Sequence, residues 1–358
     1  MKKDFLRRIE ELANREGFVF LGCSPITSVS SDVFDRFTYW LNEGFGGSMA
    51  YLSKVKQDLR EIIDWAVSVF VFAWLYPRYE SQSRYGFGRI ASYALWRDYH
   101  RVFKKRLLKL GKNLTDEFPG LRFKCITDAF PILEKALALQ VDSEKLFMGK
   151  NTLLIHKNFG SFFLLGEIVT NMKVTQVNSF RYDNNKLGCG NCVKCVTECP
   201  ANALNGCFID ARKCISYLTI EYKGPFNLEQ MRNVGDWLFG CDICQQVCPF
   251  NHKIKGKNFC SFLQTDLRVT PSFSLIEVLS LNEEKFKSLF MGTPVLRAGL
   301  EGFQRNAIAV CFNQGFQEAL PMIRNLTKSD SDTVNQTASL ALSKWKVRSV
   351  PTKLVVIN

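Results

Sequence analysis

The sequence predicts an α/β N-terminal domain, a cysteine-rich segment and an all-α C-terminal module. Three observations predict this order. Helix-like and strand-like patterns alternate up to about residue 175, two cysteine runs with little periodicity lie between about 180 and 260, and helical patterns return from about 270. A chain of 358 residues is long enough for two or three domains, each with its own core.

The N-terminal domain is predicted from segments in which apolar residues recur with helical or strand spacing. Helices are expected over 4–16, 31–44, 91–114 and 131–139, and strands over 18–22, 65–75, 121–128, 151–156 and 161–170. We expect the helices to cover both faces of one sheet. Pro131 suits the first turn of its helix, because its missing N–H has no intrahelical partner there. Asp128 then lies in the strand-to-helix connection, where α/β folds present functional groups.

Neither an export signal nor a membrane span is predicted. The first residues, MKKDFLRRIEELANREGF, carry charges throughout and lack the apolar stretch and the cleavage site of a signal peptide. The strongest apolar run, 65–76, has about half the length that a bilayer requires and is better explained as a buried strand. We therefore expect a cytoplasmic protein. In a reducing cytosol, its 13 cysteines favour metal binding over disulfides.

The C-terminal module is predicted from short helical segments that Gly, Pro, Asn and Asp separate. These segments cover 274–281, 282–290, 305–315, 318–329 and 332–345. Paired short helices of this kind indicate a small helical repeat module of the HEAT type.

The two cysteine runs have the spacing of a bacterial ferredoxin. The first run is C-x2-C-x2-C-x3-C before Pro200, in which the fourth cysteine binds the other of two cubane clusters. The second run, C-x2-C-x3-C before Pro249, lacks only the first cysteine, which Cys214 can supply from a distance. The predicted ligands are Cys189, Cys192, Cys195 and Cys248 for one [4Fe–4S] cluster and Cys199, Cys214, Cys241 and Cys244 for the other.

Alternatives remain open for these cysteines. C-x2-C pairs also suit tetrahedral zinc, although zinc ribbons do not need the x3-C-P ending. Cys207 rivals Cys214 as the remote ligand. Two clusters conduct electrons without defining a reaction, so another part of the chain must use those electrons. The remaining cysteines are expected to be buried small apolar residues, and they are Cys23, Cys125, Cys260 and Cys311.

Sequence fingerprints narrow the other cofactors. No G-x-G-x-x-G follows a strand and no G-x-x-x-x-G-K-[ST] occurs, so the first domain is not an obvious flavin, nicotinamide or ATP site. Only three histidines are present, His100, His156 and His252, which argues against a histidine-rich redox metal centre.

Several longer segments resemble the epoxyqueuosine reductase family and follow its order. They are GRIASYALWRDYH (88–100), TDAFPILEKALAL (127–139), GKNTLLI (149–155), LGEI (165–168), CGNCVKCVTECPANAL (189–204), DARKCISYLTIE (210–221), GCDICQQVCPFN (240–251) and RAGLEGFQRNA (297–307). The resemblance covers nearly the whole chain. It implies a cobalamin-binding and catalytic α/β domain over 1–178, a two-cluster ferredoxin-type domain over 179–265 and a HEAT-like tail over 266–358.

The resemblance also implies an activity. Members of this family reduce the epoxide of epoxyqueuosine, at the wobble position of a transfer RNA anticodon, to the alkene of queuosine. Electrons would pass through the two [4Fe–4S] clusters to cobalamin. Opening an epoxide leaves an alkoxide, so an acid is required. Asp128 matches the family's proposed general acid, and we expect burial under the corrin ring to raise its pKa. Without the resemblance, Asp128 would be interpreted as a helix N-cap.

The resemblance implies further contacts to cobalamin. Besides Asp128, these are Arg60, His100, Lys150, Asn151, Ser216 and Asp242. The Asp-x-His-x-x-Gly pattern of proteins that bind cobalt through histidine is absent, in agreement with a cobalamin that has no histidine ligand on its lower face. One stretch departs from the family: QVDSEKLFM stands just before Gly149, where a Gly/Trp-rich sequence is usual. This departure puts the local shape of the cofactor pocket in doubt.

The net charge of +13 suits a polyanionic partner such as transfer RNA. Expected phosphate contacts are 104–112, 253–257, Arg297 and Arg305. We expect a monomer that receives electrons from a low-potential donor. Two other functions are compatible with the cysteine runs. One is a corrinoid iron–sulfur reductase of a small molecule, as in the related reductive dehalogenases, and the other is a ferredoxin-like electron carrier without chemistry of its own.

Overall fold

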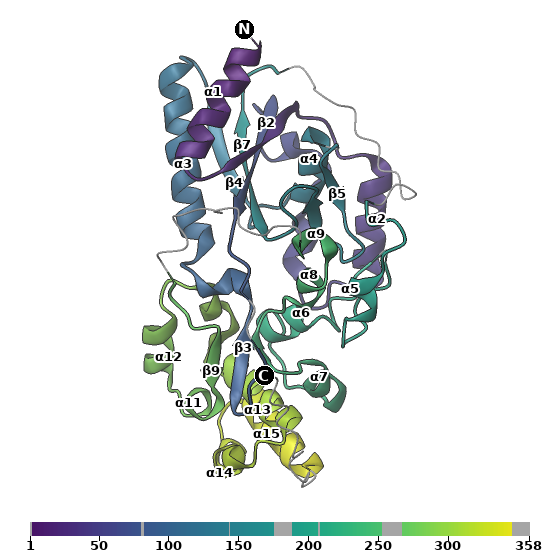
Figure 1. Cartoon of the computed structure of the whole chain (residues 1–358), viewed down its shortest axis with the longest axis vertical. Coiled ribbons are helices and arrows are strands. Elements are labelled where there is room, and N and C mark those ends of the chain that lie inside the picture. Colours follow the sequence, from purple (N-terminus) through teal and green to yellow (C-terminus); the bar gives the residue numbers. More distant parts are fainter. Residues whose placement is uncertain are drawn as a thin grey trace, which may run out of the picture.

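The computed structural model describes residues 2–79, 82–142, 144–174, 188–206, 208–252 and 267–345. Figure 1 shows two bodies with a cysteine-rich segment beside them. The predicted domain boundaries, 178/179 and 265/266, lie outside the described residues. No helix in the described part of the chain is both long and apolar enough to cross a bilayer.

The N-terminal body contains most of the strands. Its helices are α1 (Lys2–Arg15), α2 (Ser31–Asn42), α3 (Tyr99–Glu117) and α4 (Glu134–Val141), with 3-10 turns η1 (Ala50–Lys54), η2 (Leu59–Glu61) and η3 (Ser92–Leu95). Its strands are β1 (Val19–Pro25), β2 (Ser68–Leu75), β4 (Phe123–Thr127), β5 (Leu146–Met148), β6 (Leu154–His156) and β7 (Phe163–Thr170), whereas β3 (Phe87–Ile90) lies in a second sheet.

A four-stranded sheet with the order β1-β2-β7-β4 forms the centre of this body, and each neighbouring pair is antiparallel. Every residue of β2 is buried, as the apolar run of the sequence predicted. Helices α1 and α3 pack on one face of the sheet, and α4 packs on the other. The prediction of helices on both faces is therefore confirmed. Alternation of helix and strand did not fix strand direction, because long connections allow either orientation.

Two helix starts differ from the prediction. The expected helix 91–114 is divided into η3 and α3, because the side chain of Asp98 accepts a hydrogen bond from the backbone N–H of His100 and caps α3. Helix α4 begins at Glu134, three residues later than expected, with Leu133 at its N-cap. Pro131 is thus not in the first turn of a helix. Instead, Pro131 follows a tight turn in which the backbone N–H of Phe130 donates a hydrogen bond to the carbonyl oxygen of Thr127.

The cysteine-rich segment and the tail contain mainly short elements. The segment has α5 (Lys194–Thr197), α6 (Ile215–Ile220), α7 (Leu228–Asn233), β8 (Trp237–Phe239), α8 (Ile243–Gln246) and α9 (Pro249–His252). The tail has β9 (Ser272–Ser274), α11 (Leu275–Leu279), α12 (Glu283–Phe290), η5 (Pro294–Ala298), α13 (Gly299–Gln314), η6 (Gln317–Ala319), α14 (Leu320–Leu326) and α15 (Asp332–Lys344). The helical C-terminal part is confirmed, and its HEAT-type repeat stays a prediction.

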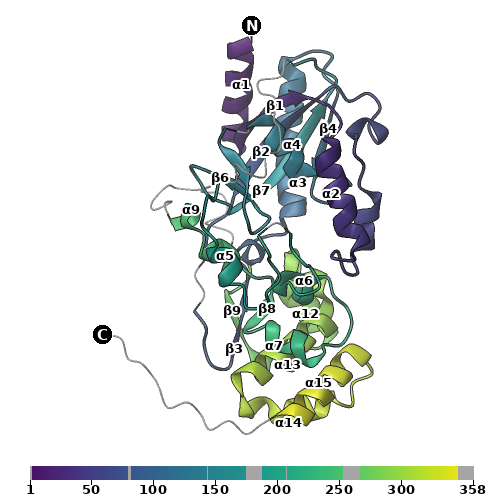
Figure 2. The same cartoon turned by 90° about the vertical axis from the view of Figure 1, so that its right-hand side faces the viewer.

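A second sheet, with the order β8-β3-β9, joins the three parts of the chain. Strand β3 pairs in parallel with β8 of the cysteine-rich segment and antiparallel with β9 of the tail. Figure 2 shows this sheet below the first, next to the tail helices. Residues 87–90 therefore lie outside the N-terminal body, although the segments before and after them in sequence belong to it. Local sequence patterns did not predict this position.

Arg305 of α13 fastens the tail to the cysteine-rich segment. Its side chain is fully buried and donates hydrogen bonds to the carbonyl oxygens of Leu218, Tyr222 and Gly224 at 2.7 to 2.9 Å. The side-chain oxygen of Asn306 accepts two more. The expectation that Arg305 contacts phosphate is wrong, because these donors are already satisfied inside the protein.

Candidate active site and cysteine clusters

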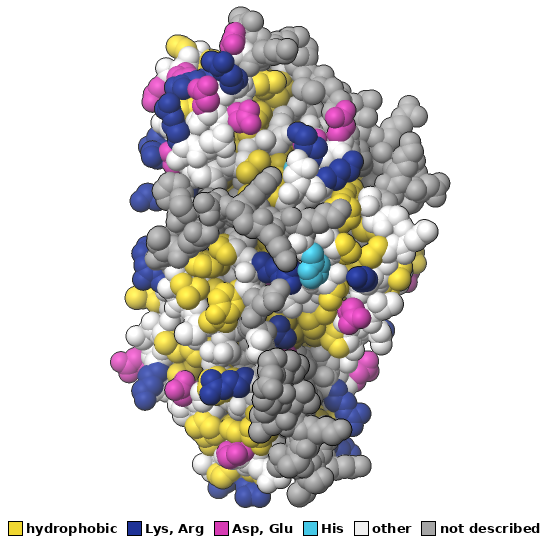
Figure 3. Space-filling model, in the orientation of Figure 1, with side chains coloured by type: hydrophobic (Ala, Val, Ile, Leu, Met, Phe, Trp, Pro, Cys, Tyr) yellow, Lys and Arg dark blue, Asp and Glu magenta, His cyan; other side chains and the backbone are white. Residues whose placement is uncertain are grey.

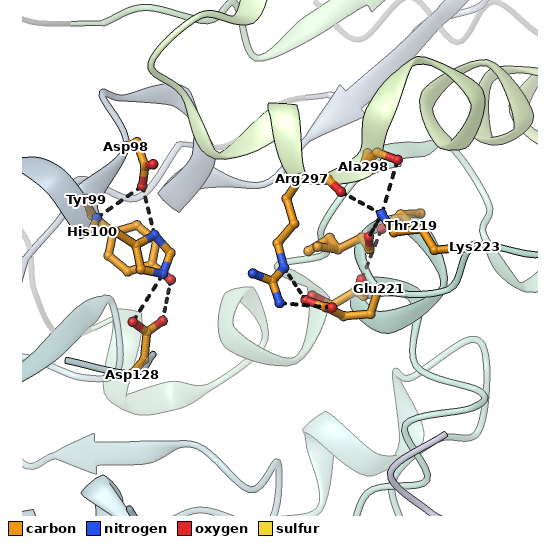
Figure 4. A network of polar contacts seen from close by, with 11 residues as sticks. Asp98, Tyr99, His100, Asp128, Thr219, Glu221, Lys223, Arg297 and Ala298 are labelled. Carbon is orange, nitrogen blue, oxygen red and sulfur yellow. Dashed lines mark hydrogen bonds and ion pairs between the residues drawn. The ribbon is translucent and has the colours of Figure 1, made fainter. Parts of the chain in front are cut away.

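Asp128 lies at the centre of a polar cluster between β4 and α3. Its Oδ2 accepts a hydrogen bond from the Tyr99 hydroxyl at 2.6 Å, and its Oδ1 lies 3.2 Å from Nε2 of His100. The other ring nitrogen of His100, Nδ1, lies 2.8 Å from Asp98. Figure 4 shows the imidazole held between the two carboxylates. The helix-cap interpretation of Asp128 is wrong, since α4 begins six residues later and Leu133 occupies its N-cap position.

The charges in this cluster stabilise one another. Burial tends to raise the pKa of Asp128, but the hydrogen bonds and charge of His100, together with the Tyr99 hydroxyl, outweigh burial and lower it. Hydrogen bonds that the His100 ring donates to Asp128 and Asp98 raise the pKa of His100 to about 9. At neutral pH the proton therefore resides on His100, next to an ionised Asp128. In the protein itself, the pKa of Asp128 moves in the opposite direction to the one expected from the sequence.

Two pockets meet at Tyr99. The first has a volume of about 100 Å³, and its polar lining includes Asp128, Glu134 and Lys135. The second has a volume of about 170 Å³ and includes His100 and Arg297 in its lining. Apolar side chains of the first pocket come from the β6 region and β7, and they are Leu153, Leu154, Phe163, Leu164 and Leu165. The two pockets together place the Asp128 cluster at an accessible hollow between the N-terminal body and the tail.

Arg297 closes the tail side of this hollow. It forms an ion pair with Glu221 and lies between that residue and the Asp128 cluster in Figure 4. The charge of the guanidinium also acts on the hydroxyl of Tyr51, whose ring is about half exposed. Because Tyr51 belongs to η1 and Arg297 to η5, this interaction connects the two bodies at the rim of the hollow.

Glu134 and Lys135 were not among the predicted site residues. The side chain of Lys135 donates a hydrogen bond to the carbonyl oxygen of Thr152 at 3.0 Å, and burial lowers its pKa. Thr152 has a φ of 60°, an unusual conformation for a β-branched residue. One feature of the sequence could have identified them: Glu134 and Lys135 are two adjacent charged residues directly after PIL in TDAFPILEKALAL, near the predicted start of an apolar helix.

The cysteines predicted for the first cluster lie together. Cys189, Cys192, Cys195 and Cys248 all line one small pocket, together with Lys150 and Asn151. The ammonium of Lys150 donates to the carbonyl oxygen of Gly190 at 2.8 Å. Buried Asn151 lies 3.4 Å from the carbonyl oxygen of Cys244. Lys150 and Asn151 therefore lie at the cysteines, away from the linings of the two pockets at Tyr99.

The cysteines predicted for the second cluster form another group. Burial raises the pKa of the Cys244 thiol, and the neighbouring Cys214 and Cys199 raise it further. Cys199 and Cys241 pack against a small apolar cluster, and Tyr93, a lining residue of the second pocket, packs against the same cluster. Cys207 and Cys260 lie outside the described residues. Cys23, Cys125 and Cys311 are buried, as predicted.

The remaining predicted cofactor contacts lie apart from Asp128. Buried Asp242 accepts hydrogen bonds from the backbone N–H and the hydroxyl of Ser92, both at 2.7 Å, and so ties η3 to the second cysteine group. The backbone N–H of Ser216 donates to Cys214. Arg60 is an exposed residue paired with Asp58, and it lines neither pocket at Tyr99.

The stretch that departs from the family forms a hairpin beside the first cysteine group. Strands β5 and β6 pair antiparallel, and Phe147 packs in an apolar cluster with Cys248. The departure from the family sequence therefore affects the shape of the pocket that the first cysteine group lines. Ser143 lies outside the described residues.

Basic side chains are distributed along one edge of the molecule. Figure 3 shows Lys and Arg along the left edge, where α3 runs in Figure 1. Lys104, Lys105 and Lys112 of α3 are exposed, whereas the ammonium of Lys109 lies 2.8 Å from Glu16. The predicted contact 253–257 lies outside the described residues.

Two family models match the chain. One is described as a 4Fe-4S double cluster binding domain and matches residues 188–251. The other is described as Epoxyqueuosine reductase QueG, DUF1730, and matches residues 56–129. The cysteine-rich segment is therefore a [4Fe–4S] double-cluster domain, as its spacing predicted, and the zinc alternative is not supported.

Similar proteins agree with these matches. The chain is 38% identical to an epoxyqueuosine reductase of Francisella cf. novicida over 266 residues, which cover 73% of this chain and 71% of the relative. It is 33% identical to one of Cyclobacterium marinum over 306 residues, which cover 83% and 94%. A crystal structure of epoxyqueuosine reductase with an epoxyqueuosine-modified tRNA-Tyr stem loop has the same fold, with a TM-score of 0.79, 24% identity, and coverage of 95% of this chain and 90% of that one.

Proposed function

The chain belongs to the epoxyqueuosine reductase family, and we propose that it reduces epoxyqueuosine to queuosine in transfer RNA. It is an oxidoreductase with two [4Fe–4S] clusters. The observation that carries the proposal is the Asp128–His100–Tyr99 cluster, which holds an available proton at an open pocket beside the second cysteine group.

The reaction determines what this cluster must do. Conversion of an epoxide to an alkene consumes two electrons and two protons, breaks both carbon–oxygen bonds and releases water. Asp128 faces the pocket and delivers a proton to the epoxide oxygen, so that the oxygen does not leave as an alkoxide. His100, with its pKa of about 9, is the source of this proton and passes it to Asp128 through the 3.2 Å contact. Tyr99 orients the carboxylate by donating to its other oxygen.

Each cysteine group supplies the thiolates for one cluster. We assign the first cluster to the pocket that Cys189 and Cys248 help to line, and the second to the group around Cys244. Cys199 and Cys241 of the second group pack against the same apolar cluster as Tyr93, which lines the second pocket at Tyr99. The second cluster is therefore the closer one to the chemistry, and the low-potential donor delivers its electrons to the first. When bound, the clusters pass single electrons from donor to active site.

The pocket at Asp128 fits a cobalamin in two respects. Its apolar wall suits the edge of a corrin ring. Both ring nitrogens of His100 are engaged by carboxylates, so this imidazole offers no lone pair to cobalt. Asp128 and His100 would lie against the cofactor. Cobalamin, when bound, supplies a strongly reducing and nucleophilic metal centre.

Transfer RNA reaches the hollow from the side where the two bodies meet. Arg297 is a cation beside the pocket, and half-exposed Tyr51 offers a face on which an unstacked anticodon base can lie. The exposed lysines of α3 continue the positive surface away from the hollow. The tRNA stem loop in the crystal structure of an epoxyqueuosine reductase is a ligand of this kind, with phosphates and loop bases.

An anaerobic turnover assay tests the proposal. Reconstituted protein receives a low-potential reductant and transfer RNA that carries epoxyqueuosine, with cobalamin added or omitted, and the nucleosides are analysed by mass. We expect loss of one oxygen to give queuosine, with dependence on cobalamin. No conversion by a protein that holds its full iron content would contradict the proposal and favour a small-molecule substrate or an electron-carrier role.

A further inference from the structure

Two carboxyl groups near Asp128 take no part in the proton transfer from His100: fully buried Glu167 and partly buried Glu134. Glu167 is fully buried in the middle of β7, and neither of its carboxyl oxygens has a hydrogen-bond partner among the described residues. The Oε2 atom of Glu134 is also buried without a described partner. An unpaired ionised carboxylate in such a place would be very costly, so the neutral acid is favoured.

The backbone places the two groups on the same side of the sheet. Glu167 pairs with Val71 of β2 and with Ile126 of β4, two residues before Asp128. Its neighbours Leu165 and Val169 belong to the apolar cluster that α4 covers, so strand alternation directs Glu167 toward α4 as well. Glu134 is the first residue of α4 and shares its pocket with Asp128.

The charges that surround Glu134 come from several elements. Asp128 in the loop after β4 and Glu167 on β7 are acidic, whereas Lys135 on α4 is basic. On α3, Tyr99 lies within electrostatic reach of Glu134, and His100 contacts Asp128. Burial, followed by the charge of Asp128, raises the pKa of Glu134 to about 7. Burial and then the charges of Glu134 and Asp128 raise the pKa of Glu167 well above its ordinary value.

We propose that Glu134, backed by Glu167, supplies Asp128 with the second proton that each reduction consumes. This inference rests on the proposed function. The first proton reaches the epoxide oxygen as one carbon–oxygen bond breaks, and leaves Asp128 ionised with a neutral His100. The second carbon–oxygen bond breaks when the resulting hydroxyl is protonated and departs as water. Two electrons from the low-potential donor balance the two protons. Glu134 acts through Asp128, and Glu167 acts through Glu134.

Glu134→Gln and Glu167→Gln test this route, with Glu284→Gln as the matched control because Glu284 is exposed on α12. In the unmodified protein, turnover should fall as pH rises through about 7. In Glu134→Gln, we expect turnover to fall about 100-fold and this pH dependence to disappear. A merely structural residue would lower turnover without changing the shape of the pH profile. The proposal is overturned if Glu134→Gln keeps the unmodified rate and profile.

Infrared difference spectroscopy on the purified holoprotein, without transfer RNA, gives a readout that does not require activity. A carbonyl band of a protonated carboxylic acid should titrate near pH 7 in the unmodified protein and in Glu284→Gln, and should be absent in Glu134→Gln. Glu167→Gln should remove a second band that persists to higher pH. If Glu167→Gln does not fold, the Glu134→Gln spectrum alone decides, and an unchanged spectrum refutes the proposal. If the unmodified protein makes no queuosine but the bands titrate as expected, the proposed function fails while the protonated pair stands.

Discussion

His100 contacts Asp128 through Nε2 at 3.2 Å, while its Nδ1 lies 2.8 Å from Asp98. The imidazole is therefore a cation between two anions in the resting protein. Proton transfer from this arrangement does not require a carboxyl group of raised pKa at Asp128, because the neighbouring histidine retains the proton at neutral pH.

Asp128→Asn should lower turnover by about 100-fold to 10,000-fold, because the amide cannot pass a proton from His100 to the substrate. It should also lower the pKa of His100, which loses one of its two anionic partners. Turnover assays and an NMR titration of the imidazole measure the two effects. Asp116→Asn, at an exposed position of α3, is the control. An unchanged rate would remove Asp128 from the mechanism.

The His100 ion pairs should make stability depend on alkaline pH. Because the folded pKa is raised from 6.5 to about 9, the stabilisation is fully present below about 6.5 and is lost as pH rises through about 9. We expect the free energy of unfolding to fall over this window in the unmodified protein and to fall less in His100→Gln. Urea unfolding at a series of pH values measures this difference. Parallel curves for the two proteins would show that His100 is not charged in the folded state.

Cysteine substitutions should remove one cluster at a time. Cys248→Ser is expected to lose the cluster of the first group, and Cys214→Ala that of the second, since each removes one of four thiolates. Iron and sulfide analysis, with electron paramagnetic resonance of the reduced protein, measures the loss. Cys311→Ala and Cys207→Ala should keep both clusters. Loss of a cluster in Cys207→Ala, with retention in Cys214→Ala, would reverse the choice of remote ligand.

Arg305→Met should destabilise the protein by about 3 kcal/mol or more, since three buried carbonyl oxygens would lose their donor. The comparison is Arg324→Met, at an exposed position of α14, which should change stability by less than about 0.5 kcal/mol. Urea unfolding measures both variants. Equal stabilities would mean that α13 does not depend on this arginine.

Arg297→Gln should weaken the binding of transfer RNA and reduce its salt dependence. Removal of one phosphate contact lowers the slope of log K against log salt concentration by about 0.7 to 0.9. Filter binding or fluorescence anisotropy over a range of salt concentrations measures the slope, with Arg324→Gln as the exposed control. A weaker affinity with an unchanged slope would indicate that Arg297 acts only through Glu221.

Much of the fold could be predicted because it depends on residues close together in sequence. The apolar run over 65–75 became buried β2, and the periodic tail became helices α11 to α15. Helix starts were less predictable. The side chain of Asp98 accepts a hydrogen bond from the backbone N–H of His100, so α3 begins there and the expected longer helix is interrupted. Helix α4 begins three residues after Pro131.

The spacing of the cysteines was enough to predict the chemistry of the cysteine segment, because ligand spacing in a ferredoxin run is a local property of the chain. The sequence also pointed to Asp128. The tertiary structure alone decided the protonation of that site, since Tyr99 and His100 are 29 and 28 positions away in sequence.

Other long-range features could not be read from local patterns. The second sheet around β3, the burial of Arg305 and the position of Glu167 behind Glu134 each depend on which distant segments pack together. Periodicity identifies the buried face of an element but not its partner across the core. Burial and hydrogen bonds between residues far apart in sequence therefore set the pKa values at the site. These pKa values decide where the proton resides, which could not be predicted from the sequence.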